Sequence, residues 1–332
     1  MIKRIAFALL LIIPFIINSC KNDLDLLSDY KEQIVCFGVL DPDDTAHYIR
    51  VSKVFLGEGN ALEFAQNQDS IQLSPSEMEV RISRIQNGTE AQYWILTPDT
   101  SIPRDEGIFL YPNQVVYRGV FPVLTDGSTY KLTVTDLTNG YVTWSETSVV
   151  KDVNHTSPTG FQFLNLEDAG SIGFYFTTGA YARRYQLKVR FWYDEKFVYD
   201  TTQTALKYVD WYIGETDSYA THGGEGLSIS VPRRNFINML ANNIEVNNLV
   251  RRYSRRIDLY YTSAHDDLVT YIKVQQANAS SSAELPEFTN MHDGLGLFTT
   301  RNTSVFTNFH IDQDTQYALA TETVLQDLNF VY

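Results

Sequence analysis

The alternation of apolar and polar residues along the chain predicts a mainly β protein. Residues 78–85 alternate cleanly, and residues 129–135 repeat the same period of two. The pairs Asn87-Gly88 and Asn139-Gly140 are typical of hairpin turns. Short strands that end in such turns favour a two-sheet sandwich. We therefore expect an immunoglobulin-like or fibronectin-like β-sandwich over residues 31–150.

A second β-rich domain is predicted for residues 161–332, after a polar, proline-containing linker at residues 151–160. Two helices interrupt its strand-like pattern. The first, near residues 233–250, is indicated by apolar residues that recur every four positions. The second, near residues 264–277, follows a Ser-Ala-His-Asp sequence that is typical of a helix start. The expected fold is thus a sandwich followed by a β-rich domain with two inserted helices.

The first twenty residues have the layout of a bacterial lipoprotein signal. Lys3 and Arg4 precede an apolar run over residues 5–17, and Ser19-Cys20 follows it. The run is shorter than the ~20 residues that a membrane-spanning helix needs. We expect cleavage of residues 1–19, acylation of Cys20 with palmitate or a similar chain, and a tether over residues 20–30. An ordinary N-terminal anchor helix with an incidental cysteine is the alternative.

Composition narrows the class of function. The 332 residues include 26 Lys and Arg against 40 Asp and Glu, which gives a net charge of −14. Nucleic-acid binding needs a basic surface, so this class is excluded. Two cysteines, one of them at the expected lipid site, exclude a disulfide scaffold. Cys36 lies in an apolar, strand-like run, and we expect it to be a buried hydrophobic residue.

The sequence contains no catalytic or metal-binding motif that we recognise. The six histidines are scattered, and neither His-Glu-x-x-His, a phosphate-binding glycine loop nor Gly-x-Ser-x-Gly is present. We therefore expect no metal and no cofactor. A carboxylate pair for glycoside hydrolysis leaves no sequence signature, because its spacing is set by the fold. A surface hydrolase acting on glycan or peptide stays open as the alternative function.

Aromatic residues are the candidates for ligand contact. Trp192, Trp211 and Tyr212 fall on predicted strands that have one face open to solvent. Aromatic faces stack on sugars and anchor protein partners, although packing in the core is the competing interpretation. The pairs Arg251-Arg252 and Arg255-Arg256 fit an acidic partner, lipid phosphates or a solvated helix end.

Residues 286–298 carry a resemblance to a known family. They read Pro-Glu-Phe-Thr-Asn-Met-His-Asp-Gly-Leu-Gly-Leu-Phe, and the matching positions are Gly294, Leu295, Gly296 and Phe298. This resembles the signature of Bacteroidetes outer-membrane lipoproteins labelled domain of unknown function 4249, with Asp293 where that family usually has Asn. The two glycines permit either a turn or bulge that leads into a core strand, or a loop that cradles a ligand.

The resemblance implies an accessory lipoprotein that accompanies a TonB-dependent outer-membrane receptor. The acidic stretch after Cys20 also resembles the export signal that sends such lipoproteins to the outer-membrane surface. The expected function is a lipid-anchored, non-catalytic binding or interaction protein of the outer membrane. Its expected partners are a TonB-dependent receptor and a glycan or peptide ligand.

Overall fold

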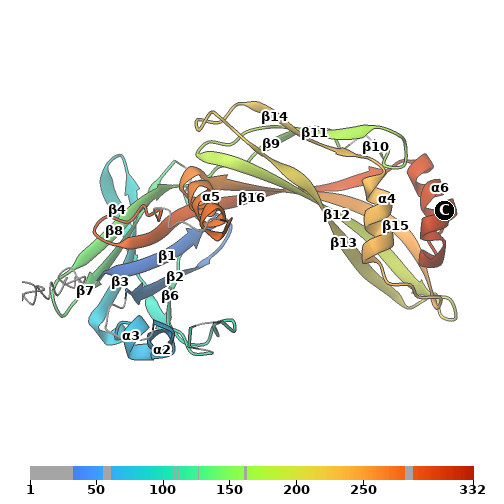
Figure 1. Cartoon of the computed structure of the whole chain (residues 1–332). Coiled ribbons are helices and arrows are strands. Elements are labelled where there is room, and N and C mark those ends of the chain that lie inside the picture. The colour runs from blue at the N-terminus through green and yellow to red at the C-terminus, as the bar shows by residue number, and fades with distance from the viewer. Residues whose placement is uncertain are drawn as a thin grey trace, which may run out of the picture. The chain divides into compact units, whose positions relative to one another are not determined.

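A computed structural model describes residues 33–54, 61–107, 109–110, 112–125, 127–160, 163–280 and 287–332 (Figure 1). The expected signal peptide, Cys20 and the tether lie outside the described residues. Gln33–Tyr332 form one compact unit. Within the described ranges, no helix is long and apolar enough to cross a membrane.

Strands dominate the element order. The strands are β1 (Ile34–Leu40), β2 (Ala46–Lys53), β3 (Met78–Gln86), β4 (Thr89–Ile95), β5 (Thr97–Asp99), β6 (Val116–Val120), β7 (Thr129–Asp136), β8 (Val142–Ser148), β9 (Asn154–Ser157), β10 (Phe163–Leu164), β11 (Ser171–Thr177), β12 (Ala182–Phe197), β13 (Thr204–Asp217), β14 (Gly226–Pro232), β15 (Val250–His265) and β16 (Leu295–Ile311). The helices are α2 (Ala61–Ala65), α3 (Gln68–Ile71), α4 (Asn235–Asn243), α5 (Asp266–Ser280) and α6 (Gln313–Thr321), with short 3-10 turns η2 (Pro75–Glu77) and η3 (Thr323–Leu328).

The mainly β fold class is confirmed, and the N-terminal part forms a two-sheet sandwich. One sheet has the strand order β4-β3-β7-β8, and β5, β6, β2, β1 and the first part of β16 form the other layer. Alternate residues of β3 and β7 are buried between the layers. Asn87-Gly88 makes the β3–β4 turn, with positive φ at both residues. Met291 and Phe298, from the far end of the sequence, also pack in this core.

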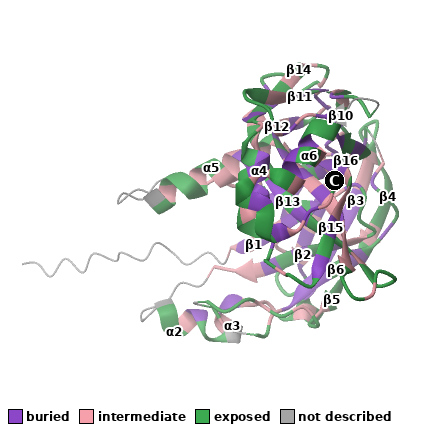
Figure 2. Ribbon diagram, turned by 90° about the vertical axis from the view of Figure 1, so that its right-hand side faces the viewer, coloured by how far each residue is buried: buried purple, intermediate pink, exposed green. Residues whose placement is uncertain are grey.

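A second hydrophobic core lies beneath the long strands β13, β12, β15 and β16. The three-stranded sheet β14-β11-β9 packs against it, and so does α4 (Figure 2). Phe236 and Leu240, from the apolar stripe that indicates this helix, are fully buried. The helix ends at Asn243, earlier than predicted, because Ile244 already has extended backbone angles.

Strand β16 belongs to both cores. It pairs in parallel with β1 near its start and antiparallel with β15 further on. Phe298 packs in the first core, and Phe309 packs in the second. The two β-rich regions therefore share one continuous strand of 17 residues.

The segment at residues 151–160, predicted to be a linker, is fixed to β16. It contains β9, which pairs with β11. The Asp152 carboxylate accepts hydrogen bonds from Asn302 Nδ2 at 3.1 Å and from Ser304 Oγ at 2.8 Å. The Val153 N–H donates to Ser304 Oγ at 3.0 Å. These bonds satisfy polar groups that β16 buries, so the segment is part of the packed structure.

The helix predicted near residues 264–277 is α5, which covers Asp266–Ser280. Helix α6 is absent from the sequence-based prediction. Its N-cap is Asp312, whose side chain accepts the Thr315 N–H at 2.8 Å. An aspartate that starts a helix in this way is a local signal that could have revealed it.

Candidate functional site

A pocket of about 460 Å³ lies on the face of the sandwich sheet that points away from the core. Strand β1 explains its position. Ile34, Cys36 and Leu40 are buried in the core, and Val35 and Phe37 project from the opposite face, because successive strand residues alternate. Both faces of β1 are thus covered, which accounts for the unbroken apolar run in the sequence.

Neighbouring strands and separate segments complete the pocket. Strands β1, β2 and β16 form one side, α5 contributes Tyr271 and Gln275, and the segments that precede β6 and β16 supply most of the rest. The volume lies in the range of small-molecule sites, roughly 300–1,000 Å³. The described lining residues are Val35, Phe37, Arg50, Ser52, Lys53, Val54, Ile71, Arg104, Phe109, Tyr271, Gln275, Glu287, Phe288, Leu295 and Gly296.

Two arginines from distant parts of the chain face this pocket. The Arg50 guanidinium carbon lies 5.2 Å from the ring centroid of Phe37, its cross-strand neighbour, and that of Arg104 lies 5.2 Å from the ring of Phe109. Among the described residues, neither guanidinium has a hydrogen-bond or ion-pair partner, and the Arg104 Nε is buried. Burial and the nearby charge of Arg50 both lower the pKa of Arg104.

The remaining lining is largely apolar and aromatic. The rings of Phe37 and Tyr271 meet edge to face, with centroids 5.8 Å apart, so α5 packs directly on β1. Phe288 and Leu295 add further apolar surface. Glu287 is the one carboxylate among the described lining residues, and its side chain is exposed.

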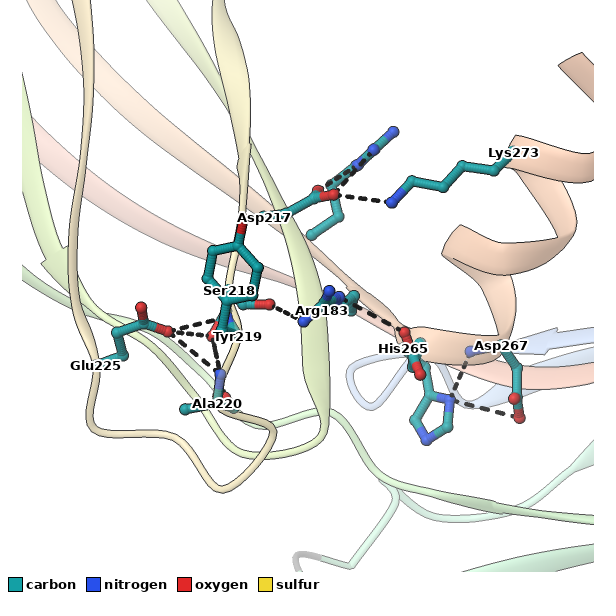
Figure 3. A network of polar contacts seen from close by, with 11 residues as sticks. Arg183, Asp217, Ser218, Tyr219, Ala220, Glu225, His265, Asp267 and Lys273 are labelled. Carbon is teal, nitrogen blue, oxygen red and sulfur yellow. Dashed lines mark hydrogen bonds and ion pairs between the residues drawn. The ribbon is translucent and has the colours of Figure 1, made fainter. Parts of the chain in front are cut away.

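Polar contacts fix α5 beside the pocket (Figure 3). Lys273 Nζ lies 3.0 Å from the Asp217 carboxylate of β13, which Arg184 Nε also contacts at 2.7 Å. Hydrogen bonds from Arg184 and Lys273 hold the pKa of Asp217 at about 2. At the start of the helix, His265 Nδ1 accepts the Asp267 N–H at 3.3 Å. The helix that carries Tyr271 is therefore tied to the β12–β13 hairpin.

The described part of the segment that carries the family resemblance, residues 287–298, connects three elements next to the pocket. The Asn290 side chain exchanges two hydrogen bonds with the Phe298 backbone and donates to Asp267 at 2.9 Å. The His292 ring stacks on Trp144 with centroids 3.9 Å apart. These contacts join β8, α5 and β16 through one short loop.

Gly296 is the second residue of β16. Its φ is +110°, and a Cβ at this position would lie 1.9 Å from the Cys36 carbonyl oxygen. A Cβ on Gly294 would lie 2.3 Å from the Thr143 hydroxyl. The backbone therefore approaches its neighbours too closely for a side chain at both glycines, and Leu295 and Gly296 also line the pocket. Phe298 is a core residue.

Cys36 is fully buried, and burial raises the pKa of its thiol. The structure thus places it as the small hydrophobic residue that the sequence indicated, without the electropositive, accessible setting that a reactive thiol requires.

The three aromatic candidates do not share one surface. Trp211 is 6% exposed and packs against Phe236 in the second core, so its assignment to a binding face is wrong. Trp192 and Tyr212 lie on the outer face of the β12–β13 hairpin. Tyr212 is exposed, whereas Trp192 donates from Nε1 to Asp258 at 2.6 Å. The alternation that puts Tyr212 outward puts Trp211 inward.

The four arginines at positions 251–256 lie on strand β15, and the helix-end interpretation is wrong. Arg252 is 2% exposed and contacts Glu195 at 2.8 Å. Arg256 contacts Asp258 at 3.2 Å.

Among the described residues, no group of three or more His, Cys, Asp or Glu side chains could hold a metal ion.

Comparisons with known proteins add little to this description. No protein-family model matches the chain, and no curated protein is similar to it. A solved structure with a partial likeness to the chain is the C-terminal globular domain of an oligosaccharyltransferase from Pyrococcus abyssi, at 9% identity and a TM-score of 0.25. The match covers 68% of this chain and 45% of that one, so the chain spans less than half the length of that structure.

Proposed function

We propose that this protein is a lipid-anchored binding protein of the bacterial outer membrane. It holds a small ligand in the pocket between β1, β2, β16 and α5, and it works beside a TonB-dependent receptor. The observation that carries the binding role is the pocket itself. It has an apolar, aromatic lining and two guanidinium groups that no described residue pairs. Pockets of this size and lining are typical of ligand sites.

The membrane anchor is supported by the sequence before residue 33. The basic start, the short apolar run and Ser19-Cys20 match a lipoprotein signal. The resemblance of residues 286–298 to a family of outer-membrane lipoproteins supports the same location and the receptor partner.

Binding is favoured over hydrolysis by the lining of the pocket. Hydrolysis of a glycosidic bond uses two carboxylates about 5–10 Å apart. Glu287 is the single carboxylate that the described lining offers. The lining residues suit recognition of a ligand better than acid–base chemistry on it.

The test of the receptor partnership is a native pull-down from outer membrane solubilised in mild detergent, with an affinity tag after Tyr332. We expect a TonB-dependent receptor in stoichiometric amount. A Cys20→Ala variant is the matched control and should lose the receptor, because it loses the membrane anchor. Recovery of the protein alone at native expression would contradict the partnership.

A further inference from the structure

We infer that the pocket takes a small amphiphilic anion, in which a carboxylate or phosphate group contacts Arg50 and Arg104 and an apolar body lies against Phe37, Tyr271 and Phe288. This inference rests on the proposed binding function and adds the chemical class of the ligand. The two oxyanions share the property that counts here, which is a compact negative charge with several hydrogen-bond acceptors.

The two pocket arginines carry the charge part of the inference. Two guanidinium groups close enough to influence each other repel. The Arg104 Nε is also buried without an acceptor, which costs free energy, whereas Arg50 is an exposed residue at the pocket. Three other arginines of this chain, Arg184, Arg190 and Arg252, contact carboxylates at 3.0 Å or less. An oxyanion placed between Arg50 and Arg104 would satisfy both, since carboxylates and phosphates match the guanidinium fork.

Contacts with neighbouring residues also restrict the positions of Arg50 and Arg104 before any ligand binds. The guanidinium carbon of each lies over an aromatic ring, 5.2 Å from its centroid, and this contact restricts the side chain. Arg50 is fixed on β2 opposite Phe37, so its position follows from the sheet register. A pre-positioned donor pair loses less entropy when the ligand binds.

The rest of the lining defines the other end of the ligand. Phe37, Tyr271, Phe288 and Leu295 offer apolar surface that a free inorganic anion would leave exposed to water. Glu287 adds one negative charge to the lining and disfavours a ligand with a second anionic group. A pocket of about 460 Å³ accepts a molecule of small-ligand size and is too small for a folded partner.

The test is isothermal titration calorimetry of the purified chain without its lipid anchor, residues 33–332, which form one compact unit. It uses three matched probes: 4-phenylbutyrate, 3-phenylpropyl phosphate and the neutral 4-phenylbutanamide. Charge-assisted hydrogen bonds predict that at least one anion binds about tenfold or more tightly than the amide. Arg50→Gln and Arg104→Gln should each reduce that preference to about threefold or less. Arg251→Gln, at an exposed arginine on β15, is the matched control and should change nothing.

The outcomes separate this inference from the proposed function. The probe anion that binds more tightly shows whether the ligand of this pocket carries a carboxylate or a phosphate group. If all three probes bind with equal affinity, and the pocket-filling variant Ser52→Trp abolishes their binding, the anion inference is overturned and the binding function is supported. Binding of none of the probes to the unmodified chain would overturn both.

Discussion

At position 296 the backbone leaves no room for a side chain. Its φ of +110° is unfavourable for any residue with a Cβ, and the Cys36 carbonyl occupies the space that a Cβ would need. We expect Gly296→Ala to lower the free energy of unfolding by about 2 kcal/mol or more. Urea denaturation measures this.

Gly226→Ala is the matched control for that variant. A methyl group added to Gly226 would have no atom within 4 Å, and the substitution should cost less than about 1 kcal/mol. Equal effects of the two substitutions would show that the close approach at Gly296 is unimportant.

Arg252 is a structural residue despite its position in an arginine-rich run. Besides its ion pair with Glu195, it donates to the Leu328 carbonyl at 2.6 Å and to the Glu245 carbonyl at 2.9 Å. Replacing it with methionine leaves the Glu195 carboxylate without its partner in a half-buried site, and we expect a loss of about 3 kcal/mol. The exposed neighbour Arg251, changed to methionine, should shift stability by about 0.5 kcal/mol or less. A similar small loss for Arg252→Met in thermal unfolding would refute this role.

Residue-level predictions from the sequence succeed where the pattern is local. Cys36 in its apolar run is buried as expected, and Asn87-Gly88 makes the expected turn. The sequence could not assign Trp211 to the inner or the outer face of its strand. The face depends on the pairing register, which shifts nearby at Leu187/Lys188. Arg50 and Arg104 could not be brought together from sequence, since 54 positions and several strands separate them.

At the scale of elements, β16 is the one that sequence patterns hide. Its first residues are apolar, but Thr299, Thr300, Asn302 and Ser304 are buried polar residues. Such residues normally indicate an exposed strand or a loop. Thr300, Asn302 and Ser304 are satisfied by the chain around Asp152, for example through the Thr300 Oγ1 bond to the Ser148 carbonyl at 2.6 Å. The Thr299 hydroxyl is buried without a hydrogen-bond partner among the described residues. Burial of these groups depends on a segment some 150 residues away, which no local pattern shows.

Helix α5 depends on an ion-pair network that responds to acid. The pKa of Asp217, about 2, lies below its ordinary value near 4, so the ionised carboxylate stabilises the folded state above pH ~4. That contribution is lost as the pH falls from about 4 toward 2. We expect Asp217→Asn to have a lower melting temperature than the unmodified chain at pH 6 and a nearly equal one near pH 2. A constant difference across this range would contradict the linkage.

At the scale of the whole molecule, two hydrophobic cores share one strand. The sandwich core contains Met291 and Phe298, and β1 needs β16 as its parallel neighbour. We therefore expect a fragment of residues 31–150, expressed alone, to lack a cooperative thermal transition by circular dichroism. The full chain is the control. A cooperative transition in the fragment would show that the N-terminal sandwich is an independent domain.

The central claim is that a lipid-anchored chain holds a small molecule in the β1–β2–β16–α5 pocket. Native mass spectrometry of the protein, extracted from membranes in mild detergent, tests both parts at once. We expect the chain to begin at an acylated Cys20. A non-covalently bound small molecule should be present on the protein that retains Ser52 and missing from the Ser52→Trp variant. A chain that retains residues 1–19, together with equal small-molecule content in the two proteins, would contradict the account.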